Sequence, residues 1–326
     1  MITKRIWRIF LITLIIALPV RLYQTLCLLE PETGFYSDGF VSTGIVFIAL
    51  MAGCVLLYAD AARGKAPVPV LPLRSKPAAV TAAIAGLLFI GQSAYSLIAA
   101  PSVENGVMNG ILAAADLLAG AALLCQAYGH AAGKNLWERH PLPALLPPLW
   151  GCVCLVAMFI TYSGSVNIAE NVYDTFSVVF LLLAFFAYAK LHAGMETERS
   201  ARGIVRFGLM AVLFAAVTVI PELLLLLTGV TPATSYPVGM YLMNGAAALF
   251  LLFFLLALHR AEPAPAPREE PEDAQEPVSE EPSASPAEPD ETEAFAGKLQ
   301  EAYGAEETFL QKEKSPFPKN NSENDG

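Results

Sequence analysis

Apolar residues along this chain gather in eight stretches, each about as long as a bilayer is thick. A helix of about 20 predominantly apolar residues crosses the hydrocarbon core of a membrane. Such runs place the spans at residues 6–26, 40–59, 78–98, 109–128, 144–162, 175–191, 207–228 and 237–258. The pattern predicts an all-α bundle of eight transmembrane helices.

The apolar pattern ends at His259-Arg260, which divides the chain into two predicted domains. Residues 261–326 hold 18 of the 30 acidic and 5 of the 20 basic residues, so this tail carries −13 and residues 1–260 carry +3. We therefore expect a transmembrane domain over 1–260 and a cytoplasmic acidic tail over 261–326. The acidity of the tail argues against direct binding of nucleic acid or anionic lipid.

The tail itself divides into two parts. Residues 261–288 are rich in Pro, Glu, Ala and Ser, and they offer too little apolar surface to offset the entropy of ordering, so they predict a disordered linker. Residues 290–312 place apolar side chains such as Phe295, Leu299 and Leu310 at roughly helical spacing. Two interpretations stay open for this segment: a short amphipathic helix that binds a protein partner, or a fraying, mostly disordered stretch.

Basic residues fall on one side of the predicted topology, and the loops on the other side contain none. The positive-inside rule assigns the basic side, together with both termini, to the cytoplasm. The first span also has the basic start of a signal peptide. It lacks a small-x-small cleavage site at Ala17-Leu18-Pro19-Val20, which favours an uncleaved signal-anchor. The 14 basic residues are Lys4, Arg5, Arg8, Arg63, Lys65, Arg74, Lys76, Lys134, Arg139, Lys190, Arg199, Arg202, Arg206 and Arg260.

Five polar residues lie inside predicted spans at a similar depth. Arg21 and Glu222 lie about 15 residues into outward-running spans and Asp116 about 7 residues into an inward-running one, which at about 1.5 Å per residue puts all three in the outer third of the membrane. Gln92 and Asn244 fall near the same level. Ionisable side chains in hydrocarbon usually face a bundle interior or a cavity. These five residues are the predicted ligand-binding site.

Prolines accompany this layer, since Pro19 lies two residues before Arg21 and Pro221 immediately precedes Glu222. Proline frees a backbone carbonyl, which a membrane helix tolerates where it lines a cavity or packs on protein. Three interpretations of Arg21 stay open. It pairs with Asp116 or Glu222, or binds an anionic ligand, in an outward-facing pocket; it forms a structural ion pair that fixes helix register; or it snorkels to the outer headgroups.

The outer side also carries carboxylates with no loop Lys or Arg against them. We interpret them as solvated loop residues, with a cation-attracting vestibule as the alternative. They are Glu30, Glu32, Asp38, Glu104, Glu170 and Asp174.

A weak internal repeat relates the two halves of the transmembrane domain. Tyr36-Ser37-Asp38 matches Tyr173-Asp174, and Met108-Asn109-Gly110 matches Met243-Asn244-Gly245, at nearly one offset. Two four-span units in the same orientation, about 1–135 and 136–260, are one interpretation. Chance matches in a biased composition are the other.

No motif in the chain assigns a cofactor or a catalytic residue. A P-loop, a Rossmann glycine fingerprint, HExxH and GxSxG are all absent from the sequence. The five cysteines lack zinc-site spacing and are interpreted as packing residues. The histidines are expected at cytoplasmic helix ends without clustering, so no metal site is expected; they are His130, His140, His192 and His259.

The segment Arg21-Leu22-Tyr23-Gln24, followed by residues 29–35 (LEPETGF), resembles a stretch of uncharacterised multi-span membrane proteins of Gram-positive anaerobic bacteria. The resemblance implies a bacterial plasma membrane and carries no activity or ligand. Taken alone, Pro31-Glu32-Thr33-Gly34 predicts an exposed turn outside the first span.

The favoured function is that of a transporter-like or ligand-binding membrane protein, which would use the polar layer for a small-molecule or ion ligand. The alternative is a membrane scaffold or regulator whose tail recruits a cytoplasmic protein partner. An enzyme that acts on lipid or a cell-envelope precursor is least favoured, because paired catalytic groups are missing from the sequence.

Overall fold

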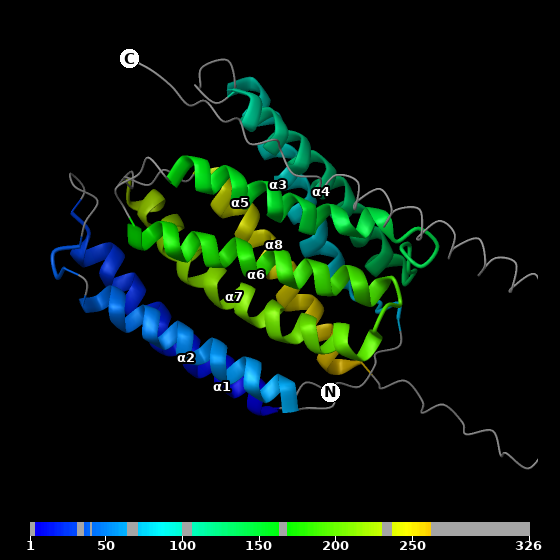
Figure 1. Ribbon diagram of the computed structural model, residues 1–326, viewed down its shortest axis with the longest axis horizontal. Helices are drawn as coiled ribbons and strands as arrows, with labels where there is room; N and C mark the ends of the chain where they lie inside the picture. Colours follow the sequence, from blue (N-terminus) through cyan, green and yellow to red (C-terminus); the bar gives the residue numbers. More distant parts are fainter. Residues whose placement is uncertain are drawn as a thin grey trace, which may run out of the picture. The chain divides into compact units, whose positions relative to one another are not determined.

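The computed structural model describes residues 4–30, 36–39, 41–63, 71–99, 106–162, 168–229 and 237–261 (Figure 1). Over these ranges the protein is all-α, with eight helices long and apolar enough to cross a membrane, which confirms the predicted spans. They are α1 (Lys4–Tyr23) with the π-helix η1 (Gln24–Leu28), α2 (Val41–Arg63), α3 (Lys76–Ala99), α4 (Gly106–Ala132), α5 (Leu146–Tyr162) after the 3-10 turn η3 (Leu142–Leu145), α6 (Ile168–His192), α7 (Thr197–Thr228) and α8 (Val238–Arg260).

Two helices begin more than three residues earlier than the hydropathy predicts. Helix α6 begins at Ile168 instead of residue 175, because Asp174 is buried within the helix and accepts a hydrogen bond from Tyr241. Helix α7 begins at Thr197 instead of residue 207. Its first turns are polar, and the pair Glu198–Arg202 spans one helical turn at 3.7 Å. Hydropathy marks where a helix crosses a membrane, and these helices continue through polar turns.

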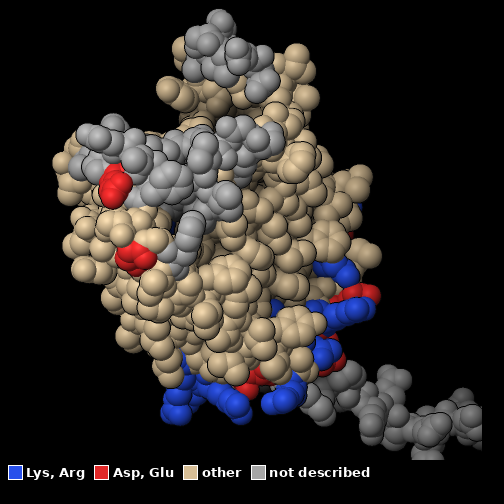
Figure 2. All heavy atoms as spheres, turned by 60° about the vertical axis from the view of Figure 1, so that its left-hand side comes forward, with Lys and Arg blue, Asp and Glu red and all other residues tan. Residues whose placement is uncertain are grey.

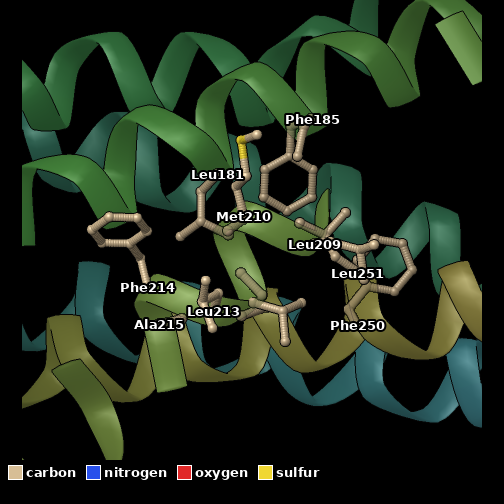
Figure 3. Close-up of a cluster of buried hydrophobic side chains, with 14 of the residues drawn as sticks. Leu181, Phe185, Leu209, Met210, Leu213, Phe214, Ala215, Phe250 and Leu251 are labelled. Atoms are coloured by element: carbon tan, nitrogen blue, oxygen red, sulfur yellow. The ribbon is translucent and has the colours of Figure 1, made fainter. Parts of the chain in front are cut away.

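Helix α7 lies at the centre of the bundle. Of its most apolar window 72% is buried, against 33% for α1 and α2. It packs against α6 and α8 and also contacts α1 and α2. Figure 3 shows the core that results, where Phe185 of α6 stacks on Phe250 of α8 and Phe214 of α7 lies further along the same core. A helical segment that is apolar on all sides is usually buried by neighbouring helices on every side. The apolar part of α7 is surrounded in this way by α1, α2, α6 and α8.

The outer helices present apolar side chains to the surroundings. Leu11, Ile12, Ile15 and Ile16 of α1 are all exposed, as are Ile45 and Ile48 of α2. Exposed apolar surface on this scale is what a bilayer covers.

Helices α3 and α4 approach each other closely through small residues. A Cβ atom added to Gly86 would lie 2.8 Å from the carbonyl oxygen of Gly120, and one added to Gly120 would lie 2.9 Å from that of Gly86. Small residues allow membrane helices to pack backbone against backbone. The Ala- and Gly-rich sequence of α4 therefore fits its close packing on α3.

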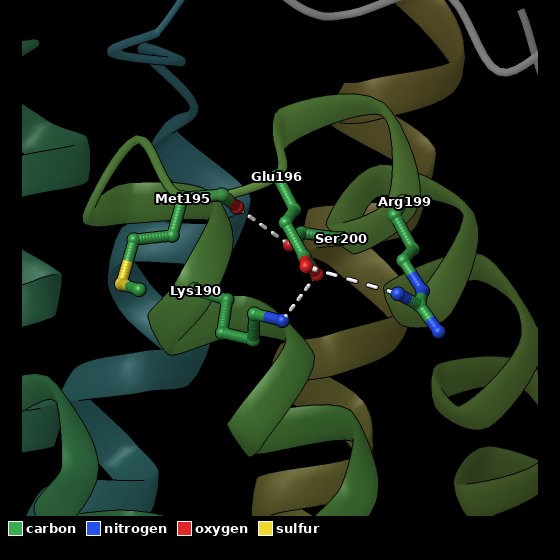
Figure 4. Close-up of polar contacts among 5 residues, drawn as sticks. All are labelled: Lys190, Met195, Glu196, Arg199 and Ser200. Carbon is green, nitrogen blue, oxygen red and sulfur yellow. Dashed lines mark hydrogen bonds and ion pairs between the residues drawn. The ribbon is translucent and has the colours of Figure 1, made fainter.

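Lys and Arg side chains gather at one end of the bundle, here called the basic end (Figure 2). The turn between α6 and α7 lies there. Its Glu196, in a left-handed conformation with φ of 43°, holds Lys190 and Arg199 through its carboxylate (Figure 4). The hydrogen bond from Lys190 lowers the pKa of the Glu196 carboxyl below its usual value.

By its contacts the chain separates into two units, Met1–Ala266 and Pro267–Gly326. The predictions for the tail, a disordered linker over 261–288 and an amphipathic segment over 290–312, lie outside the described residues. So do the predicted turn over 31–34 and the carboxylates Glu32 and Glu104.

Candidate ligand-binding site

Arg21 is wholly buried near the end of α1. Its Nη1 donates to the Oε1 of Gln24 at 2.9 Å and to the hydroxyl of Tyr36 at 2.6 Å. Its Nε approaches the carbonyl of Val217 in α7 at 3.4 Å. The guanidinium is thus bound inside the bundle, so snorkelling to the headgroups is wrong as an interpretation of this residue.

Two helices with locally irregular hydrogen bonding meet at Arg21. The carbonyl of Val217 is the one that residue 221 would bond in a regular helix, and Pro221 has no N–H to donate, so this carbonyl is free to accept from Arg21. On the other side, α1 carries Pro19 and changes into the π-helix η1 directly after Tyr23. The hydroxyl of Thr25 bonds the carbonyl of Arg21 at 2.9 Å. π-Helical turns are frequent at functional sites.

A second set of contacts fixes the groups around the guanidinium. The Nε2 of Gln24 donates to the hydroxyl of Thr43 at 2.6 Å, and the hydroxyl of Tyr173 donates to the carbonyl of Thr43 at 3.1 Å. The rings of Tyr36 and Tyr173 lie 5.9 and 5.1 Å from Cζ of Arg21. At these distances aromatic rings attract a cation. Segments from α1, α2, α6 and α7 therefore hold one arginine in a fixed position.

Helix α8 connects this cluster to the rest of the predicted layer. A Cβ atom added to Gly239 would lie 1.7 Å from the Oε1 of Gln92, so the glycine makes room for the α3 side chain. The hydroxyl of Tyr241 donates to Asp174 of α6 at 3.2 Å. Asn244 is buried on the same helix, as is Glu222 on the neighbouring α7.

Asp116 lies elsewhere, between α4 and α5. Its Oδ1 accepts a hydrogen bond from Nε1 of Trp150 at 2.6 Å, and its Oδ2 has no hydrogen-bond partner among the described residues. The Trp150 ring packs edge-on against Phe89 at 4.7 Å. The predicted pairing of Arg21 with Asp116 is therefore wrong, because Asp116 faces an indole N–H of α5.

The outer carboxylates are only partly the solvated loop residues that we predicted. Asp174 is a buried helix residue bonded to Tyr241. Asp38 accepts the backbone N–H of Ser42 at 2.9 Å and so caps the start of α2. Glu30 is exposed, as expected.

The sequence prediction missed both tyrosines that contact Arg21. The weak internal repeat could have indicated them, because Tyr36 and Tyr173 are the first residues of its two matching segments. The structure brings these two side chains to the same guanidinium. The prediction also missed Trp150, for which nothing in the sequence indicated a polar partner.

A second buried polar cluster lies toward the basic end. Nδ1 of His130 lies 2.9 Å from the carbonyl of Leu73, which can only accept, so this nitrogen carries the proton. The hydroxyl of Tyr188 lies 2.8 Å from Nε2 of His130 and 2.7 Å from Gln126. The His192 ring is 6.0 Å from that of His130, so the expectation that the histidines do not cluster is wrong for this pair. Tyr188 of α6 brings them together, because its hydroxyl bonds Gln126 and lies within bonding distance of His130, both of α4. Among the residues described, no group of three metal-ligating side chains is found.

The fold and its buried polar layer define the class of the protein as a multi-pass, all-α bundle of membrane-spanning type. No protein-family model, curated protein or solved structure matches the chain.

Proposed function

We propose that this membrane protein binds a small anionic ligand at Arg21 and acts as a transporter-like or ligand-binding protein. One observation carries the proposal: the buried guanidinium of Arg21 lies within bonding distance of the carbonyl that Pro221 frees in α7, beside the π-helical turn η1 that follows α1. In transporters, irregular helical segments near the binding site supply polar groups for the substrate. An arginine whose fork is already oriented by neighbouring oxygens suits a carboxylate or a similar planar anion.

The proposed site comprises Arg21, Glu222 and Asn244, with Gln92 joined through α8. Gln24, Tyr36 and Tyr173 position the guanidinium. Asp116 belongs to the same proposed layer but would act separately, since its bonded partner is Trp150. The proposal includes the orientation, in which the basic end faces the cytoplasm of a bacterial cell and the Arg21 end faces outward.

The test is a ligand screen on the purified full-length protein by thermal unfolding. The probes are short mono- and dicarboxylates, amino acids and inorganic sulfate. Because a ligand that binds only the folded state stabilises it, at least one anion should raise the Tm by about 5 °C at roughly 100 times its Kd. Arg21→Lys keeps the positive charge but loses the paired N–H donors of the planar guanidinium. It should therefore abolish the increase in Tm caused by the anion. Tyr36→Phe should weaken binding about tenfold.

Tyr188→Phe is the matched control, because it also removes a buried, hydrogen-bonded hydroxyl but toward the basic end. It should keep the full anion-dependent shift even if its own Tm is lower. An equal shift in wild type and Arg21→Lys would contradict the proposal, as would a complete panel without a stabilising anion. Either outcome would leave a structural role for Arg21.

The acidic tail supports the second candidate, a scaffold that recruits a cytoplasmic protein. Its basis is composition alone: 18 acidic and 5 basic residues over 261–326. Deleting these residues separates the two candidates. A ligand-binding protein should keep its anion-dependent shift after deletion, whereas a scaffold should lose its cellular role while the bundle stays folded.

A further inference from the structure

A cavity of about 510 Å³ lies at the basic end, between the start of α3 and the end of α8. Arg74 and Lys76 line it from one side and Arg260 from the other. Its volume falls within the range of small-ligand sites. No carboxylate is among its lining residues.

The three cations of this cavity form no ion pair or hydrogen bond within the described ranges, whereas Lys190 and Arg202 at the same end are paired with Glu196 and Glu198. The stem of Arg74 passes close to Gly133, since its Cβ, Cγ and Cδ lie within 3.7 Å of the position that a Cβ on this glycine would take. All three cations are exposed, so the cavity is positive and open to a ligand.

Side chains, and not the end of α3, would recognise an anion here. Ser75 already satisfies the first amides of the helix: its Oγ accepts from Ala78 at 3.4 Å and its carbonyl from Ala79 at 2.9 Å. Pro77 has no N–H to offer.

The α8 wall of the cavity is largely apolar, and apolar side chains continue along α8 beyond the cavity. Phe253 and Leu256 of α8 line the cavity and are half-buried. Leu249 lies four residues before Phe253 on the same helical face and is 43% exposed. These three side chains form a stripe along α8 on which an acyl chain can lie, a feature that a soluble anion would not need.

We propose that this cavity binds the phosphate headgroup of an anionic phospholipid, with an acyl chain along the stripe of Leu249, Phe253 and Leu256. Basic pockets between membrane helices bind lipid headgroups in this way. The proposal is independent of the ligand site at Arg21, since it concerns the opposite end of the bundle.

The experiment is native mass spectrometry of the full-length protein in detergent, titrated with dioleoyl-phosphatidylglycerol or dioleoyl-phosphatidylcholine. Wild type should retain the anionic lipid in preference to the zwitterionic one. The triple variant Arg74→Gln, Lys76→Gln, Arg260→Gln should lose that preference. Each basic residue near a lipid surface contributes a factor of about five in affinity, so the loss should be roughly 100-fold.

The control is a second triple variant, Lys4→Gln, Arg8→Gln, Arg63→Gln. It removes the same charge from exposed residues outside the cavity. It should bind phosphatidylglycerol like wild type, and both variants are first checked for an unchanged elution volume. Equal losses in the two triples would overturn the proposal, because they would indicate a general charge effect. Displacement of the lipid by millimolar inorganic phosphate would also overturn it, in favour of a site for a soluble anion.

Discussion

The two sides of this bundle are held together by different means. On one side, α1 and α2 meet α6 and α7 around Arg21, where the guanidinium donates to Gln24, Tyr36 and Val217, and Gln24 and Tyr173 both donate to Thr43. On the other side, α3 and α4 meet through Gly86 and Gly120 with backbone against backbone. Lipid tails are as apolar as leucine, so membrane helices rely on polar bonds or close packing to associate. This protein uses both, in separate places.

The buried ionisable residues of the two sides differ in the same way. Arg21 bonds Gln24 in η1, Tyr36 and the carbonyl of Val217 in α7. Gln24 is itself held by a hydrogen bond to Thr43 of α2. Asp116 has one partner, Trp150, and an oxygen without any hydrogen bond in the described part of the chain. A polar residue in a span can therefore organise several helices or merely be accommodated between them.

Arg21→Ala should have the largest effect on stability. It leaves Gln24, Tyr36 and the Val217 carbonyl without their donor, and three lost bonds to a charged group, at about 1.5 kcal/mol each, sum to about 4.5 kcal/mol, or roughly 10 °C in Tm. Thermal unfolding in detergent measures this. Arg5→Ala is the control, since its pair with Asp60 at 3.1 Å leaves the arginine mostly exposed and should matter little. An equal decrease in Tm for Arg21→Ala and Arg5→Ala would mean that the buried contacts of Arg21 stabilise the bundle no more than an exposed ion pair does.

Gly86→Ala should destabilise the other side by about 2 kcal/mol. Its Cβ would meet a backbone oxygen of Gly120 at 2.8 Å, and neither helix can yield without moving apart. Gly239→Ala is the matched control. There the obstacle is the flexible end of Gln92, which can turn away, so the change should be near zero. Similar Tm values for the two variants would show that the α3–α4 contact is looser than described.

Trp150→Phe tests whether Asp116 depends on its single partner. Loss of the indole N–H should destabilise by about 1 to 2 kcal/mol, whereas Asp116→Asn keeps an oxygen acceptor and should change stability by less than about 1 kcal/mol. A double-mutant cycle of Trp150→Phe with Asp116→Ala, which removes the acceptor, isolates the bond from the lost ring volume, and its coupling energy should be about 1 kcal/mol. A coupling energy of zero would mean that the 2.6 Å contact contributes nothing.

The sequence was enough to predict the eight helices because hydropathy and span length decide where a chain can cross a bilayer. It was also enough to place Arg21 and Glu222 beside helix-breaking prolines. The partner of the freed carbonyl could not be read from the chain. Val217 and Arg21 are 196 residues apart, and only the packing of α1 on α7 brings them together.

Partner choice was the weakest part of the site prediction for the same reason. Depth along a span follows from residue counting, so Asp116 and Arg21 were placed at similar levels. Which face each presents depends on how helices pack around the axis of the bundle, and that depends on contacts such as Gly86–Gly120. Charge complementarity suggested an ion pair, whereas packing gave Asp116 an indole from the next helix.

Glu196→Gln at the basic end should have the smallest effect and a definite pH dependence (Figure 4). The Lys190 hydrogen bond lowers the pKa of the Glu196 carboxyl in the folded state. The stabilisation is therefore complete above the ordinary glutamate pKa and is lost as the pH falls through the lowered one.

Because the group is exposed, the Tm of wild type should exceed that of Glu196→Gln by less than about 2 °C at neutral pH. This gap should close on acidification, and Lys190→Gln should reduce it at neutral pH to what the longer Arg199 pair at 3.7 Å still contributes. Glu198→Gln, whose pair with Arg202 spans 3.7 Å, is the charge-matched control. A gap that widened in acid would mean that the carboxylate is not stabilised by its lysine.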